Sequence, residues 1–152
     1  MPSLSRSVPL LAQHDHADCL PACVEMVLAS YQVGVSRRWL SEALEVTAIG
    51  TPGFKVLNLC RHGYEVTYAS AVYEGPLVEA LAANNPPIAL VYTASLPYWP
   101  RETAHAVAVV DFGEQVILHD PAFAQSPQRV SREAFMLAWA DFDYLYAVIR
   151  PR

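Results

Sequence analysis

The chain has little positive charge and no long apolar segment. Of its 152 residues, 10 are lysine or arginine and 15 are aspartate or glutamate, and Lys55 is the only lysine. Nucleic acids and anionic membranes are bound through clusters of basic side chains, so we expect neither as a partner. No apolar run reaches the roughly 18 residues of a membrane span, and the first residues lack the apolar stretch of a secretory signal.

Cysteine is also scarce. Cys19, Cys23 and Cys60 cannot all pair within one chain, and their spacing matches no disulfide framework. We therefore expect free thiols in a reducing, cytoplasmic setting. A free cysteine is usually a small buried side chain, which is the ordinary interpretation of Cys23 and Cys60.

Apolar residues, in contrast, are abundant. They make up 53% of the chain while charged residues make up 16%, as in a globular protein with a large core. A length of 152 residues is typical of one domain. We expect a single domain over residues 1–152, in which residues 1–12 form an extended lead-in.

The hydrophobic periodicity predicts helices first and antiparallel strands afterwards, an order typical of an α+β domain. The strongest local signal is a hairpin whose turn lies at residues 112–114. Helices are expected at about 19–31, 37–45, 54–61, 77–83 and 131–140, and strands at about 64–68, 88–92, 104–111, 115–119 and 144–149.

Cys19 lies where a polar segment becomes an apolar helix. Asp18 is the expected N-cap of that helix. The partial positive charge and the unpaired N–H groups at a helix N-terminus favour a thiolate, so Cys19 is a candidate nucleophile. Gln13 precedes it by six residues, and its side-chain amide is a candidate donor to an oxyanion beside the sulfur.

A cysteine nucleophile needs a base, and His105 lies in an otherwise apolar strand. If Asp111 faces Gln115 across the hairpin, Asp120 comes close to His105 on the neighbouring strand. A strict register turns Asp120 to the other face, so we expect a bulge or an end of pairing before Pro121. Asp111 is a rival partner for the histidine, but it lies at the far end of the hairpin.

These motifs are Gln-x4-Asp-Cys before an apolar helix, a histidine in a valine-rich strand, and Asp-Pro after the next strand. Together they resemble the bacteriocin-processing cysteine peptidases over roughly residues 8–150. Members are papain-like domains that cut leader peptides after a double glycine, usually as the N-terminal part of an ABC exporter. The resemblance implies a papain-like α+β fold, with N-terminal helices packed on a C-terminal antiparallel β-sheet.

The resemblance also implies roles for particular residues. By position, Cys19 is the nucleophile, His105 the base, Asp120 the group that orients it, and Gln13 the oxyanion donor. It implies a peptide or protein substrate and no metal or organic cofactor. The chain resembles stand-alone members, for which a separate ABC exporter is a candidate partner.

Four further residues are candidates for substrate binding. Leu20 stands where the family usually has glycine, a change that bears on the double-glycine preference. Tyr98 and Trp99 lie in the loop before His105, and Phe123 follows the Asp-Pro pair. Loops beside a catalytic strand commonly carry specificity, so we expect these aromatic residues to form walls of a substrate groove.

Three other interpretations are open. His14, His16, Cys19 and Cys23 have spacing that zinc could use, but no second Cys/His pair accompanies them. An acyl-enzyme captured by an amine would make the protein an acyltransferase. A degenerate domain would bind peptides without cutting them.

Overall fold

The computed structural model describes residues 4–152, so the first three residues of the expected lead-in lie outside the described part. The helices are α1 (Cys19–Ser30), α2 (Arg37–Ala43), α3 (Gly75–Ala82) and α4 (Arg132–Ala140), with 3₁₀ helices η1 (Gly53–His62) and η2 (Thr93–Ser95). The strands are β1 (Tyr64–Ser70), β2 (Ile88–Tyr92), β3 (Ala104–Phe112), β4 (Gln115–His119), β5 (Gln128–Ser131) and β6 (Leu145–Pro151). Among residues 4–152, no helix is long and apolar enough to cross a membrane.

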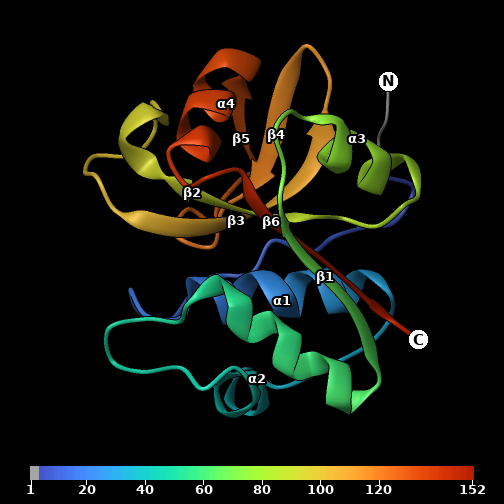
Figure 1. Cartoon of the computed structure of the whole chain (residues 1–152). Coiled ribbons are helices and arrows are strands. Elements are labelled where there is room, and N and C mark those ends of the chain that lie inside the picture. The colour runs from blue at the N-terminus through green and yellow to red at the C-terminus, as the bar shows by residue number, and fades with distance from the viewer. Residues whose placement is uncertain (1–3) are drawn as a thin grey trace.

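The six strands form one antiparallel sheet in the order β1-β6-β2-β3-β4-β5. Figure 1 shows α1, α2 and η1 on one side of this sheet and α3 and α4 on the other. The predicted α+β class is therefore confirmed, and the N-terminal helices do pack on the sheet. In addition, two later helices cover its second face.

Each face of the sheet has its own apolar core, and β2 contributes to both. Ile88 and Leu90 belong to the core beneath α1 and α2. Ala89 and Val91 belong to the core that contains the buried residues of α3 and α4. A strand that is buried on both faces has no polar alternation, which explains the uninterrupted apolar run at this position.

Two elements differ from their predicted form. The helix expected at 54–61 is a 3₁₀ helix, Gly53–His62, which ends as predicted at Gly63. Gly63 has φ of +92°, a conformation in which a side chain would be strained. Strand β5 was not predicted, because its four residues include one buried apolar side chain, that of Val130, and so carry little periodic signal.

The hairpin between β3 and β4 is displaced by one residue from the expected position. Phe112 pairs with Val116, so the three residues Gly113, Glu114 and Gln115 connect the paired positions, one residue later than the expected turn at 112–114. Asp111 pairs with Ile117, so the expected pairing of Asp111 with residue 115 is wrong. The aromatic side chain of Phe112 is fully buried, and this burial draws it from the turn into the strand.

The same hairpin contains an irregularity that decides where Asp120 points. The register shifts between Val109 and Asp111, as in a β-bulge. Continued past His119, the shifted register places Asp120 opposite Val107, on the face that His105 shares. Without the shift, alternation would turn Asp120 to the other face. A bulge or an end of pairing before Pro121 was expected, and the structure has both: the register shift, and a last pair at His119.

The lead-in lies along the domain and ends at the site. Val8, Leu10 and Leu11 pack against the core beneath α1. The backbone N–H of Gln13 then donates to the carbonyl oxygen of Pro121 at 2.9 Å. This hydrogen bond joins the segment before Cys19 to the segment after Asp120.

Trp139 in α4 is the largest fully buried side chain, and we expect it to dominate the stability of the second core. Trp139→Ala removes aromatic contacts with Phe135 and Tyr144 and should lower the free energy of unfolding by about 3–5 kcal/mol. Urea denaturation measures the change. Leu137→Ala on the same helix is the control, because that side chain is 52% exposed and should cost less than about 0.5 kcal/mol. Equal losses in the two variants would contradict this account.

Candidate active site

The segment before Cys19 is a tight loop closed by Asp18. Asp18 occupies the N-cap position of α1 as predicted, and its carbonyl oxygen accepts the N–H of Ala22 at 3.0 Å, but its side chain makes no capping hydrogen bond. The Asp18 carboxylate instead turns back and accepts the backbone N–H groups of His14 at 2.8 Å and Asp15 at 3.0 Å. Burial raises the pKa of Asp18, but the hydrogen bonds from Asp15 and Arg37 outweigh it, so the pKa is lowered. An ionised Asp18 thus holds the loop between Gln13 and Cys19.

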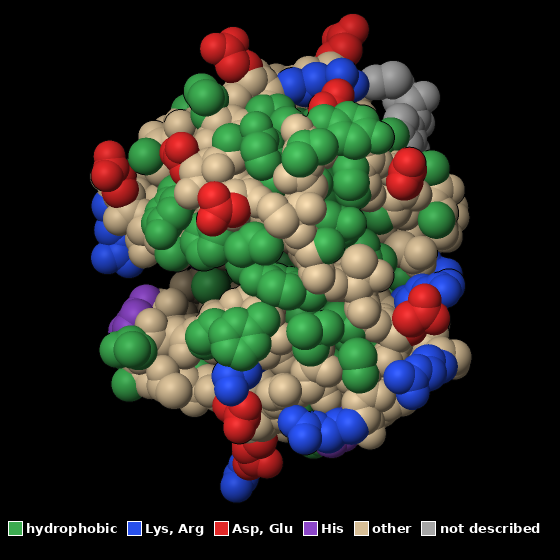
Figure 2. All heavy atoms as spheres, viewed as in Figure 1, with side chains coloured by type: hydrophobic (Ala, Val, Ile, Leu, Met, Phe, Trp, Pro, Cys, Tyr) green, Lys and Arg blue, Asp and Glu red, His purple; other side chains and the backbone are tan. Residues whose placement is uncertain are grey.

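Cys19 and His105 lie together at one cavity of about 310 Å³, although they are far apart in the sequence. Cys19 is partly exposed at the first position of α1, and His105 is buried near the start of β3. Figure 2 shows a recess at the left edge of the molecule, between its two halves, with a histidine side chain at its rim. The cavity is lined by residues of several elements, including Leu20 of α1, Gly53 of η1, Ala106 of β3 and Phe142, which follows α4.

His105 is fixed by Asp120. Its Nε2 lies 2.6 Å from Oδ1 of Asp120, which leaves Nδ1 as the ring nitrogen available to Cys19. Burial lowers the pKa of His105, but hydrogen bonds to Asp120 and Cys19 and their charges outweigh this and raise it to about 9. At neutral pH, the imidazolium form is therefore favoured.

Asp120 is fully buried and its carboxylate is fully hydrogen-bonded. Besides His105, Oδ1 accepts the backbone N–H of Ala122 at 2.9 Å. Oδ2 accepts the hydroxyl of Tyr98 at 2.7 Å and Nε1 of Trp99 at 2.9 Å. Burial raises the pKa of Asp120, but these hydrogen bonds and the charge of His105 lower it overall, so the group is a carboxylate.

Tyr98 and Trp99 hold Asp120, a role that the sequence did not predict, and Tyr98 lines neither of the two cavities at the site. They were predicted to be walls of a groove, and Trp99 and Phe123 do line a second cavity of about 890 Å³. Their polar atoms, however, point to Asp120, and the Trp99 ring packs edge-on against His105 with 4.7 Å between ring centroids. The available signal was that Tyr and Trp carry a polar group that needs a partner when buried.

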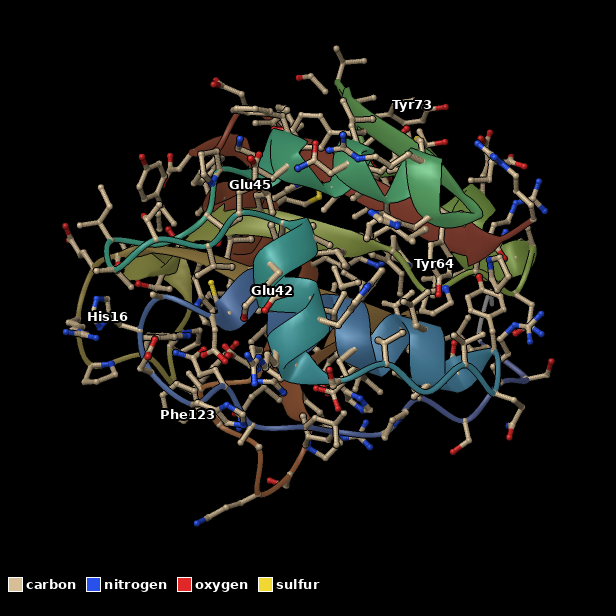
Figure 3. All side chains as sticks on the ribbon, turned by 90° about the horizontal axis from the view of Figure 1, so that it is seen from below. His16, Glu42, Glu45, Tyr64, Tyr73 and Phe123 are labelled. Atoms are coloured by element: carbon tan, nitrogen blue, oxygen red, sulfur yellow. The ribbon has the colours of Figure 1, made fainter. Side chains whose placement is uncertain are left out.

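Gln13 lies beside the second cavity and not in that of Cys19. Its Nε2 donates to the carbonyl oxygen of Asp15 at 2.9 Å, which uses one of the two N–H bonds of the amide. The two cavities adjoin, since His16 and Arg101 line both. In Figure 3, His16 and Phe123 lie at the end of the molecule where α1 begins.

Leu20 follows Cys19 and has two environments. The side chain is 2% exposed and belongs to the core beneath α1, yet it also lines the cavity of Cys19. Its bulk therefore limits the space beside the sulfur. Its role toward substrate stays a prediction.

The side chains of the zinc alternative do not form a cluster. His14 is largely exposed, and Nε2 of His16 lies 3.1 Å from the carbonyl oxygen of Ala48. Across the described residues, no group of three or more His, Cys, Asp or Glu side chains could hold a metal ion. Cys23 is fully buried in the core beneath α1.

Comparison with known proteins decides the family. Residues 7–146 match the family described as Peptidase C39 family. The chain belongs to this family. The predicted resemblance to bacteriocin-processing, papain-like peptidases is thereby confirmed. A search among curated proteins finds no match.

Solved structures of this type share the fold. The peptidase domain of Streptococcus ComA, a bifunctional ABC transporter involved in quorum sensing, is 23% identical with a TM-score of 0.76, covering 96% of this chain and 100% of that one. A C39-like protein from Bacillus anthracis is 14% identical with a TM-score of 0.80, covering 100% and 98%. A double-glycine-motif protease from an AMS/PCAT transporter, solved with the leader peptide, is 22% identical with a TM-score of 0.72, covering 100% and 99%.

The raised pKa of His105 should depend on Asp120. In Asp120→Asn the charge of the carboxylate is lost while burial still opposes the imidazolium and only Cys19 continues to favour it, so the pKa of His105 should fall well below about 9. Titration of the ring followed by NMR measures the pKa. Asp111→Asn, at the other end of β3, is the control and should leave the pKa of His105 unchanged. A pKa that stays near 9 in Asp120→Asn would mean that another group charges the ring.

Proposed function

We propose that this protein is a cysteine peptidase that hydrolyses a peptide bond through Cys19, His105, Asp120 and Gln13. The observation that carries the proposal is that Cys19 shares a cavity with a histidine whose other ring nitrogen is held by a buried carboxylate. A nucleophile, a base and a group that orients the base are the minimum for this chemistry. Membership of the Peptidase C39 family supports the same assignment.

The proposed mechanism gives each of these groups one task. The Cys19 thiolate attacks the peptide carbonyl carbon, and the second N–H of the Gln13 side-chain amide and the backbone N–H of Cys19 hold the oxyanion. His105, protonated at neutral pH because its pKa is about 9, gives its proton to the leaving amine. The resulting thioester is then hydrolysed by water, from which His105 takes a proton, and the free thiol is restored.

The proposed substrate is a peptide or protein leader cut after a Gly-Gly-type site. Two adjoining cavities support a two-part contact: the smaller one at Cys19 for the residues that are cut, and the larger one beside Trp99 and Phe123 for the rest of the peptide. One similar structure is described as a double-glycine-motif protease with its leader peptide. We further propose a cytoplasmic setting, which the three free cysteines support, and a separate ABC exporter as partner.

Cleavage of a synthetic peptide, in which a leader sequence ending in Gly-Gly is followed by several further residues, tests the function. Cys19→Ala should abolish product, and His105→Ala should reduce kcat by at least about a hundredfold because proton transfer and thiolate pairing are lost together. Gln13→Ala should lower kcat by about a hundredfold to a thousandfold with little change in KM, as expected for one oxyanion donor. Product formation followed by mass spectrometry gives the rates and the cut site.

Cys60→Ala is the matched control for this series, because Cys60 lies in η1 and does not line the cavity of Cys19. This variant should cut the peptide at the wild-type rate. Binding of the leader without any product, at all pH values tested, would favour a non-catalytic peptide-binding module. If an amine is added and the acyl part of the peptide is recovered as its amide with that amine, in place of the free acid, the acyltransferase would be favoured.

Leu20 should restrict which residues fit beside Cys19. Leu20→Ala enlarges the cavity beside Cys19. The kcat/KM for a peptide cut after Ala-Ala, divided by the kcat/KM for the same peptide cut after Gly-Gly, should therefore rise by about tenfold, which is the usual effect of one or two methylene groups in an apolar pocket. Because Leu20 is also buried in the core, the variant should lose about 2–4 kcal/mol of stability. The ratio compares two substrates on one enzyme and is insensitive to the fraction folded. An unchanged ratio would show that Leu20 does not face the substrate.

A further inference from the structure

Arg37, the first residue of α2, makes contacts that the proposed mechanism does not use. Its side chain is 11% exposed. All three guanidinium nitrogens donate: Nη1 to Oδ2 of Asp18 at 2.8 Å, Nε to Oε1 of Glu25 at 2.8 Å, and Nη2 to the carbonyl oxygen of Ala12 at 3.0 Å. A planar group with donors on every side is suited to joining three separate acceptors.

Two of these acceptors enclose the segment that carries the proposed chemistry. Ala12 immediately precedes Gln13, and Asp18 immediately precedes Cys19. Arg37 therefore holds both ends of the loop that runs from the oxyanion donor to the nucleophile. The third acceptor, Glu25, lies on α1, so the loop is also tied to the helix that begins at Cys19. Figure 3 shows α2, marked by Glu42, lying across α1.

Other contacts along this loop do not replace Arg37. Asp18 gathers the backbone N–H groups of His14 and Asp15, but these lie inside the loop. Gln13 is tied at its backbone to Pro121, which fixes its main chain on the side of Asp120. The Arg37 guanidinium is the group that hydrogen-bonds to both Ala12 and Asp18 and so bridges the two ends of the loop.

We propose that Arg37 is a positioning residue for the oxyanion hole, which holds the Gln13 side chain and the Cys19 backbone N–H in a shared orientation. This inference rests on the proposed function of the same site. Arg37 touches neither substrate nor sulfur in this role. It acts through the loop between Ala12 and Cys19.

Two reagents separate positioning of the oxyanion hole from reactivity of the thiol. Iodoacetamide alkylates Cys19 by direct displacement of iodide and forms no oxyanion. p-Nitrophenyl acetate acylates Cys19 through a tetrahedral oxyanion, forms the thioacetyl-enzyme and releases p-nitrophenolate. The ratio of the two second-order rate constants therefore measures the oxyanion hole.

Arg37→Lys keeps the positive charge beside Asp18 but offers one nitrogen in place of three, so it cannot span all three acceptors. We expect the rate constant with the ester to fall about tenfold while that with iodoacetamide stays within twofold. Arg38→Lys is the matched control, because Arg38 is the next residue of α2 and its side chain is 91% exposed. Both of its rate constants should equal those of the wild type.

A double variant shows whether Arg37 acts through Gln13. Gln13→Ala alone should lower the ester rate by about a hundredfold or more. Arg37→Lys added to Gln13→Ala should then cost less than threefold further, because the group that it positions is gone. If Arg37→Lys fails to fold, the double variant Arg37→Gln with Asp18→Asn is used in its place. It removes both charges together, allows an amide–amide hydrogen bond between positions 37 and 18, and loses the hydrogen bond to Ala12. It should show the same loss, confined to the ester.

Equal loss of both rates in Arg37→Lys, no loss of either, or full additivity with Gln13→Ala would overturn the proposal. So would an unchanged ester rate in Gln13→Ala. Neither reagent is a leader peptide, so these results do not depend on the substrate. A wild-type enzyme that reacts with the ester but cuts no peptide would contradict the proposed function and leave the role of Arg37 standing.

Discussion

The buried carboxylate of Asp120 is the constraint that the rest of the site depends on. A carboxylate removed from water is strongly unfavourable unless hydrogen bonds and an opposite charge replace the lost solvent. Here four donors do so: Nε2 of His105, the hydroxyl of Tyr98, Nε1 of Trp99 and the backbone N–H of Ala122. They come from the start of β3, from the loop before it and from the turn after β4. These three segments converge because the same ion needs donors from each of them.

The sheet and its two cores hold this ion opposite the nucleophile. His105 lies at the start of β3, whose later residues Val107 and Val109 are buried in the core that α4 shares. Cys19 packs against the other core, which contains the buried side chains of α1. The base and the nucleophile are therefore positioned by different layers and meet at the boundary between them. Neither core alone fixes their distance, so the site is sensitive to how the two layers are joined.

The sequence predicts those features of the site that depend on local residue patterns. The alternation of the β-strands and the turn between them bring Asp120 close to His105, and the apolar periodicity after Cys19 places this cysteine in the first turn of a helix. A bulge was one of two expected ways to bring Asp120 to the face of His105, but its position could not be predicted, since Val109 and Val110 differ in no property that marks an extra residue. Asp18 was assigned to the wrong partner because a short acidic side chain before a helix ordinarily caps it. Its actual partner, Arg37, is 19 residues away, and composition gives no information about such pairs.

Two carboxylates flank the nucleophile, and their different partners give them different tasks. Asp120 is paired with histidine, which can give its proton to a leaving group and take one from water and can therefore take part in the reaction. Asp18 is paired with arginine, which stays protonated and offers a rigid set of donors, so that this pair can fix geometry but cannot transfer a proton. An arginine beside Asp120 would leave the thiol without a base. A histidine beside Asp18 could not reach three acceptors at once. The choice of cation at each carboxylate thus separates the chemistry of the site from its architecture.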